Sequence, residues 1–222
     1  MTQKVTLEIE MPAPQPFALD PAKTAVVVVD MQNYFLRGDD RARMATSIAG
    51  NANLLRKARE AGAKVVFIQT IRSEHTLDVT RFGKAPTLLR GSVEGEIAEE
   101  LAPLPGEPIV EKQSFDPWAR TELEAVLAEH GIVADDWNII VPGVSSAVCA
   151  HACALGFSNR FYMTLIPLDC TAAGSLEEEA RVYAQYMSRP YSWKIAFTSS
   201  ELITFEAGAS GAEQQLRSLA TA

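Results

Sequence analysis

Short apolar runs alternate with amphipathic stretches along this chain. The apolar runs are rich in β-branched residues and cover positions 24–29, 64–69, 108–111, 137–141, 161–168 and 194–197. The amphipathic stretches have helical periodicity and cover positions 44–61, 93–101, 121–129 and 175–187. This alternation is typical of a parallel sheet with crossover helices, and continuous apolarity of the central runs indicates burial on both faces. We therefore predict an α/β fold with three αβα layers around a six-stranded parallel sheet.

The first 22 residues follow a different pattern. Apolar residues at positions 5, 7, 9 and 11 alternate with mostly polar ones, and prolines follow at positions 12, 14 and 16. This favours an edge strand or an arm laid on the core, so we expect an N-terminal arm over residues 1–22 and a single domain over residues 23–222. Residues 71–92 are rich in charge, glycine and proline and are expected to form a long excursion that covers a substrate.

Composition and charge exclude several classes of partner. The 222 residues carry 20 Lys+Arg against 28 Asp+Glu, a formal charge of −8, without a basic cluster, which argues against nucleic acid as a partner. No apolar run approaches the roughly 18 residues that a membrane span needs, so we expect no membrane partner. An odd number of cysteines, three, and the lack of a basic-then-apolar leader favour a reducing compartment, and we expect a cytoplasmic protein.

Candidate catalytic residues stand just after three of the apolar runs, where ligands bind in open parallel sheets. Asp30 follows the first run, Lys112 follows the third, and Cys149 follows a turn at positions 142–146 after the fourth. A carboxylate, an ammonium and a thiol together can form a thiolate and move a proton to a leaving group. Taken singly, Asp30 could cap a turn, Lys112 could be a solvated lysine, and Cys149 could be a small core residue. A place for Cys149 in the first turn of a helix is expected to lower the pKa of its thiol.

Three segments resemble the signature blocks of the isochorismatase-like cysteine hydrolases. They are VVVVDMQNYF, EKQSFDPWARTEL and VPGVSSAVCAHACALGF, and the similarity extends over about residues 20–205. This superfamily contains nicotinamidases, N-carbamoylsarcosine amidohydrolases, ureidoacrylate amidohydrolases and isochorismatases. The resemblance implies a Rossmann-like, isochorismatase-like fold with a catalytic triad of Asp30, Lys112 and Cys149. It further implies a homo-oligomer, whether dimer or tetramer.

The resemblance also implies the geometry around the nucleophile and a mechanism. A cis peptide bond is expected between Val144 and Ser145, with an oxyanion hole made by the backbone N–H groups of Ser145 and Cys149. Asp30 would take the proton of Cys149, Lys112 would stabilise the thiolate, and the sulfur would attack a carbonyl to form a thioester.

The chain departs from the family pattern at two places. Many nicotinamidases hold a divalent metal on an aspartate and histidines. Here the segment directly after Asp30, residues 31–35, has no histidine, and of the three histidines in the chain only His75 is in a suitable region. We therefore expect no metal and no cofactor. The second departure is Phe115-Asp116-Pro117-Trp118 after the lysine, where Asp116 could compete for Lys112, favour a cationic or amide-donor substrate, or be an exposed loop acid.

Candidate contacts to a small-molecule substrate are of two kinds. The aromatic candidates are Tyr34, Phe35, Trp118 and Phe157, and the polar candidates are Gln32, Asn33 and Gln69. The aromatic residues could equally belong to the core or to a subunit interface. Cys153, one helical turn after Cys149, is expected in the core, with a resolving thiol as the alternative.

The sequence leads to one main hypothesis and two alternatives. The main hypothesis is a metal-independent cysteine amidohydrolase that cleaves the C–N bond of a small amide, ureido or carbamoyl compound. One alternative is isochorismatase-type hydrolysis of a vinyl ether, in which the aspartate acts as an acid and no thiol is needed. The other is a catalytically idle relative that binds a small molecule, including a redox sensor built on Cys149 and Cys153.

Overall fold

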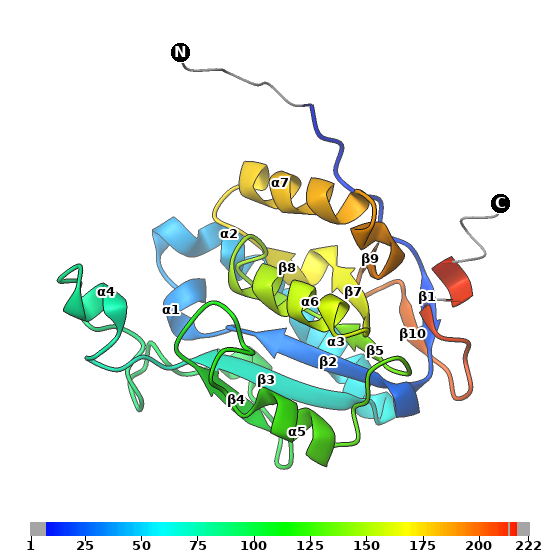
Figure 1. The fold of residues 1–222 in the computed structure, drawn as a ribbon, viewed down its shortest axis with the longest axis horizontal. Helices are drawn as coiled ribbons and strands as arrows, with labels where there is room; N and C mark the ends of the chain where they lie inside the picture. Colours follow the sequence, from blue (N-terminus) through cyan, green and yellow to red (C-terminus); the bar gives the residue numbers. More distant parts are fainter. Residues whose placement is uncertain (1–7, 213, 217–222) are drawn as a thin grey trace.

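A parallel sheet with helices on both faces forms the centre of the protein (Figure 1). The computed structural model describes residues 8–212 and 214–216. Six strands lie in the order β4-β3-β2-β5-β7-β9, and every neighbouring pair is parallel. They are β2 (Thr24–Val29), β3 (Lys64–Thr70), β4 (Ile109–Lys112), β5 (Asn138–Ile140), β7 (Met163–Pro167) and β9 (Ile195–Thr198). The predicted six-stranded core is confirmed. Two short strands extend it, β6 (Gly143–Val144) beside β2 and β8 (Thr171–Ala172) beside β6.

Helices cover the two faces of the sheet and complete the three predicted layers. The α-helices are α1 (Asn33–Leu36), α2 (Ala42–Ala45), α3 (Ser47–Ala61), α4 (Leu77–Thr80), α5 (Leu123–Glu129), α6 (Cys149–Asn159) and α7 (Leu176–Met187). Short 3₁₀ turns are η1 (Pro21–Lys23), η2 (Asp39–Arg41), η3 (Glu99–Leu101), η4 (Leu168–Cys170) and η5 (Tyr191–Trp193). Val26 and Val28 pack with α3 on one face, whereas Val27 and Val29 pack with α5, α6 and α7 on the other. Alternate residues of β2 thus point into two separate cores, as a fully buried strand requires.

Local chemistry accounts for the ends of the long helices. The α3 helix ends at Gly62, whose φ of 77° is readily available to glycine and whose N–H returns to the carbonyls of Ala58 and Arg59. The α7 helix begins at Ser175, whose side chain accepts a hydrogen bond from the N–H of Glu178.

The helix predicted over residues 93–101 is wrong. In this stretch the structure has only the 3₁₀ turn η3. Its backbone instead pairs with the segment after β2: Asn33 and Tyr34 donate N–H groups to the carbonyls of Glu96 and Glu94, and Ala98 donates to Met31. Because these long-range bonds satisfy the backbone groups that a helix would use, the periodicity of the side chains does not decide the local structure.

The N-terminal segment reaches the core before residue 22. Residues 8–16 form no helix or strand, and β1 (Phe17–Leu19) pairs in parallel with β10 (Ile203–Phe205). Phe17 and Leu19 are almost completely buried in the same core as α3. Part of the expected strand over positions 5–11 lies outside the described residues, and the division at residue 22 stays a prediction.

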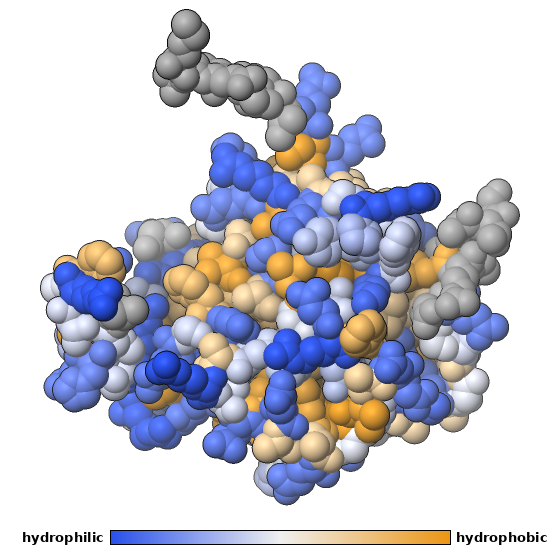
Figure 2. Space-filling view, in the orientation of Figure 1, coloured by the Kyte–Doolittle hydropathy of each residue, from blue (hydrophilic) through white to orange (hydrophobic). Residues whose placement is uncertain are grey.

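The surface mixes polar and apolar side chains. Figure 2 shows hydrophobic patches separated by hydrophilic residues on one face of the molecule. Among the described residues, no helix combines the length and the apolar character that crossing a membrane requires.

Candidate active site

Three neighbouring strands deliver polar side chains to one edge of the sheet. Asp30 directly follows β2, Thr70 is the last residue of β3, and Lys112 is the last residue of β4. Thr70 and Lys112 are register partners, and the N–H of Asp30 donates to the carbonyl of Ile68 on β3. Asp30 has a φ of 50°, the left-handed region that is uncommon for residues other than glycine. The chain thus turns sharply where β2 ends, next to the side chains of β3 and β4.

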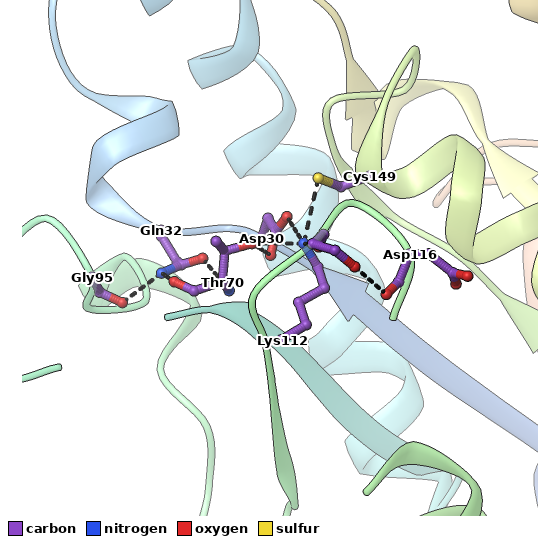
Figure 3. Close-up of polar contacts among 8 residues, drawn as sticks. Asp30, Gln32, Thr70, Gly95, Lys112, Asp116 and Cys149 are labelled. Carbon is purple, nitrogen blue, oxygen red and sulfur yellow. Dashed lines mark hydrogen bonds and ion pairs between the residues drawn. The ribbon is translucent and has the colours of Figure 1, made fainter. Parts of the chain in front are cut away.

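The ammonium group of Lys112 lies at the centre of these side chains (Figure 3). Its Nζ is 2.7 Å from Oδ2 of Asp30, 2.6 Å from Oγ1 of Thr70, 3.1 Å from the carbonyl of Ser114 and 3.4 Å from Sγ of Cys149. The side chains of Lys112 and Asp30 are both 0% exposed. The structure therefore brings Asp30, Lys112 and Cys149 together, with Thr70 between Asp30 and Lys112.

Burial decides the charge state of the thiol. The pKa of Cys149 is raised to about 12, first by burial and second by the carboxylate of Asp30, while Lys112 opposes the shift. This overturns the expectation that the start of a helix lowers the pKa of this thiol, because loss of solvent outweighs the favourable charges. Burial also acts to lower the pKa of Lys112, but the negative partners Asp30 and Cys149 raise it above its ordinary value. The resting site is therefore a buried ion pair beside a neutral thiol.

The turn before Cys149 has the expected cis peptide bond between Val144 and Ser145. In this turn Ser146 donates its N–H to the carbonyl of Ala172, and Val148 and Ala150 both donate to the carbonyl of Ser145. Within the part of the chain that the structure describes, the N–H groups of Ser145 and Cys149 have no hydrogen-bond acceptor. The oxyanion hole expected from these two groups stays a prediction.

The three polar substrate candidates bond to the protein backbone. Gln32 is fully buried, its Oε1 accepts from the N–H of Thr70 at 2.8 Å, and its Nε2 donates to the carbonyls of Thr70 at 2.9 Å and Gly95 at 2.7 Å. Gln69 also donates to the carbonyl of Gly95, and Asn33 donates to that of Val93. These amides hold residues 93–95, which follow the long excursion, against the carboxyl edge of the sheet. A substrate contact by any of them stays a prediction.

The aromatic candidates lie in two places. Tyr34 packs edge-to-face on Phe35 and carries the guanidinium of Arg41 over its ring. Trp118 packs edge-to-face on Phe157, which is fully buried in the core on the α6 side of the sheet. Phe157 thus has the core environment that the sequence left open, and its role toward a substrate stays a prediction. The carboxylate of Asp116 accepts the N–H of Trp118 at 3.0 Å and is not among the hydrogen-bond partners of Lys112 in the described residues.

Two surface cavities lie apart from the buried contacts of Lys112. One, of about 490 Å³, is lined by Asn33, Tyr34 and Glu94 among others. The larger, of about 690 Å³, is lined by Asn138, Met163 and Lys194, which begin or precede β5, β7 and β9. The larger cavity is therefore at the amino ends of the strands, opposite the edge that carries the candidate triad.

Two participants in the Lys112 contacts are absent from the sequence-based candidates. Thr70 follows the second apolar run just as Asp30 and Lys112 follow the first and third, so the same rule would have found it. The carbonyl of Ser114 has no sequence signal, because any residue carries a carbonyl and only the path of the chain aims it at Lys112.

The histidines are separate from this site. The ring of His130, at the end of α5, bonds to the carbonyl of Val126, and the ring of His151 bonds to the hydroxyl of Tyr186 at 2.7 Å. Burial lowers the pKa of His151. His75 is exposed in the excursion. No group of three or more His, Cys, Asp or Glu side chains that could hold a metal ion occurs among the described residues.

Comparison with known proteins supports the resemblance seen in the sequence. The family model described as "Isochorismatase domain" matches residues 24–192. The chain is 28% identical over 178 residues to the ureidoacrylate amidohydrolase RutB of Rhizobium rhizogenes, covering 68% of this chain and 71% of that protein. It is 26% identical over 205 residues to the RutB of Stutzerimonas stutzeri, covering 79% of this chain and 81% of that protein.

Solved structures share the same fold. The crystal structure of N-carbamoylsarcosine amidase from Thermoplasma acidophilum matches with a TM-score of 0.67 and 22% identity, covering 81% of this chain and 97% of that one. A cysteine hydrolase from Pseudomonas syringae pv. phaseolicola matches with a TM-score of 0.68 and 22% identity, covering 95% of this chain and 99% of that one. With the family model matched over most of its length, the chain belongs to the isochorismatase family.

Proposed function

We propose that this protein is a cysteine amidohydrolase that cleaves the C–N bond of a small amide, ureido or carbamoyl compound through a thioester, without a bound metal. Its ureidoacrylate amidohydrolase relatives support the broader class, a hydrolase of carbon–nitrogen bonds other than peptide bonds. The observation that carries the finer proposal is the buried contact between Cys149 and the Asp30–Lys112 ion pair. This contact supports Cys149 as the nucleophile, Asp30 as the proton acceptor and Lys112 as a fixed positive charge.

The first half of the reaction begins from the neutral thiol. Because burial holds its pKa near 12, the sulfur becomes a nucleophile only as its proton passes to the carboxylate of Asp30 during attack. The S–C bond forms, the carbonyl becomes a tetrahedral oxyanion, and the N–H groups of Ser145 and Cys149 stabilise its charge. Collapse breaks the C–N bond, and Asp30 returns the proton to the leaving nitrogen, which departs as ammonia or an amine.

The second half hydrolyses the thioester. Asp30 takes a proton from a water molecule as the oxygen attacks the thioester carbonyl, and the same two N–H groups bind the new oxyanion. The C–S bond then breaks, the acid product leaves, and the proton on Asp30 returns to the sulfur. Lys112 keeps its charge throughout, which compensates the negative charge that moves between Asp30 and Cys149.

Residue chemistry supports a reaction without a metal. The segment after β2 supplies Met31, Gln32 and Asn33, where a metal site of the nicotinamidase type would need histidines, and the amide of Gln32 is committed to the backbone. The names of the curated relatives make ureido acids the first substrates to test. A homo-oligomer in the cytoplasm is part of the same proposal.

Release of ammonia from a panel of small compounds tests this function. The panel contains ureido acids, N-carbamoyl amino acids, simple amides and nicotinamide, each assayed with and without a chelator. We expect Cys149→Ala to abolish release, and Cys170→Ala, which removes a buried thiol between β7 and β8, to retain it. The proposal is supported if ammonia release is unaffected by the chelator and depends on Cys149, and if quenched samples carry a covalent acyl adduct on that residue.

Three other outcomes would contradict it. Release that stops with chelator would disprove metal independence. If ammonia is not released but the Cys149→Ala variant still hydrolyses a vinyl ether, the aspartate acts without the thiol and the isochorismatase-type reaction replaces the proposed one. The absence of activity on every substrate would favour a catalytically idle binding protein.

A further inference from the structure

The hydroxyl of Thr70 lies between Asp30 and Lys112 of the candidate triad. Its Oγ1 is 3.0 Å from Oδ1 of Asp30 and 2.6 Å from Nζ of Lys112, and the side chain is buried (Figure 3). An ammonium group has no lone pair, so Lys112 can only donate. The Thr70 oxygen therefore accepts from Lys112, and its own hydrogen points at Asp30.

This arrangement gives each oxygen of the Asp30 carboxylate its own donor. Oδ1 receives the Thr70 hydroxyl, and Oδ2 receives the ammonium of Lys112 at 2.7 Å. Two donors from two different strands fix the rotation of the carboxylate about its χ2 angle, which is otherwise soft.

Gln32 holds Thr70 in place through its backbone. The side-chain amide of Gln32 accepts from the N–H of Thr70 and donates to its carbonyl, so both polar groups of one peptide residue are fixed by one side chain. Gln32 stands two positions after Asp30, and this pairing therefore locks the end of β2 to the end of β3. The position of the Thr70 hydroxyl relative to Asp30 is set by this buried amide.

We propose that Thr70 is a positioning residue of the reaction, orienting the Asp30 carboxylate and the Lys112 ammonium, with Gln32 holding Thr70 in register. The proposal rests on the proposed amidohydrolase function and is tested only after the native protein has shown activity that depends on Cys149. A failure of the function is then visible before any variant of Thr70 is read.

The decisive comparison is between Thr70→Val, which is nearly isosteric but lacks the hydroxyl, and Thr70→Ser, which keeps the hydroxyl. We expect Thr70→Val to lower kcat by about 10- to 100-fold with KM within about twofold, because a misplaced proton acceptor affects the chemical step. We expect Thr70→Ser to restore kcat to within about threefold of the native value. Thr164→Val removes a buried hydroxyl from β7 and serves as the matched control, with unchanged kcat.

Rescue by serine separates positioning from a general effect on the fold. Thr70→Ser keeps the hydroxyl that contacts Asp30 and Lys112 but loses the methyl group of the threonine. A packing defect would therefore persist in Thr70→Ser, whereas a positioning defect would be repaired.

Any of three results would overturn the proposal. They are a Thr70→Val variant with native kcat, a Thr70→Ser variant as impaired as Thr70→Val, and an equal loss of kcat in Thr164→Val. Circular dichroism checks that each variant is folded. If Thr70→Val is not folded, Thr70→Ala, which relieves any crowding by the valine methyl group, is read against the same three results.

Discussion

At the scale of single residues, the site combines the buried Asp30–Lys112 ion pair with the buried, neutral thiol of Cys149. The Asp30–Lys112 pair is fully buried; Asp30 also accepts a hydrogen bond from the Thr70 hydroxyl, and Lys112 also donates to the Thr70 oxygen and the carbonyl of Ser114. Removing one partner of such a pair typically costs about 3–5 kcal/mol, because the remaining charge is left without compensation. Variants of Asp30 or Lys112 therefore change both stability and catalysis. Replacing Cys149 or Thr70 by an uncharged residue leaves the ion pair intact.

The buried thiols predict a loss of stability at alkaline pH. Burial raises the pKa of Cys149 to about 12 and also raises that of Cys153, against an ordinary value of 9.0. Above pH 9 the unfolded chain loses these protons while the folded protein keeps them, so the free energy of unfolding falls as pH rises. Well above pH 9 the slope that each thiol contributes approaches about 1.4 kcal/mol per pH unit, and between pH 8 and 10 it averages about half of that. Urea unfolding between pH 8 and 10 measures this slope.

The matched variant for this measurement is Cys153→Ala. It removes one buried thiol, so its unfolding free energy should fall less steeply with pH than that of the native protein, whatever its value at pH 8. Equal slopes in the two proteins would show that Cys153 ionises as easily in the folded state as in the unfolded chain.

At the scale of elements, the contact between α6 and the loop after β4 positions the site. Trp118 of that loop packs over Gly156 of α6, where a Cβ would collide with the indole, and the guanidinium of Arg160 lies 3.8 Å from the centre of the Trp118 rings. The same loop supplies the Ser114 carbonyl to Lys112. The helix that begins at Cys149 thus also anchors the loop that contacts Lys112.

Gly156→Ala is expected to destabilise the protein by about 1–3 kcal/mol and to lower kcat, because the added methyl group pushes the Trp118 loop away from α6. The double variant Gly156→Ala/Trp118→Leu should recover part of the stability, because the ring that collides is gone. Gly174→Ala, which meets only the flexible side chain of Glu178, is the control. Urea midpoints in a double-mutant cycle measure the coupling. Additive effects of the two changes would contradict the collision.

The sequence predicts elements well where burial and periodicity agree. The continuous runs in β2 and β3 and the amphipathic α3 and α7 are all found within a few residues of their predicted positions. The prediction fails at residues 93–98, where the backbone bonds to residues 31–34 across more than sixty positions of chain. Short strands such as β6 and β8 are likewise missed, because two residues carry no periodic signal.

The candidate triad was accessible from sequence because parallel strands bring their carboxyl ends to one edge. The roles of Gln32 and Gln69 were not, since a glutamine next to a site can contact a substrate or a carbonyl, and only the path of residues 93–95 presents the carbonyls that they bind. The charge state of Cys149 was also inaccessible, because it depends on how completely the folded chain excludes water.

At the scale of the whole molecule, the N-terminal and C-terminal segments cover part of the hydrophobic core at a place distant from the candidate site. The β1 strand pairs with β10 outside the main sheet, and its ends are extended by bonds from Phe17 to the carbonyl of Leu202 and from Glu206 to that of Leu19. Phe17 packs in the same hydrophobic cluster as Leu54 and Leu55 of α3. Residues 17–19 therefore contribute side chains to the core, whereas Met11 is 40% exposed.

Phe17→Ala tests whether the folded domain begins before residue 22. Loss of a fully buried phenylalanine side chain typically costs about 3–5 kcal/mol, which urea unfolding at neutral pH would detect as a lower midpoint. Met11→Ala, a change in the same segment but at an exposed position, should shift the midpoint by less than about 0.5 kcal/mol. Because Phe17 contacts none of the residues around Lys112, kcat should stay native wherever the variant is folded. A Phe17→Ala variant as stable as Met11→Ala would instead make residues 1–22 a dispensable arm, and the domain would begin at residue 23 as the hydrophobic pattern indicates.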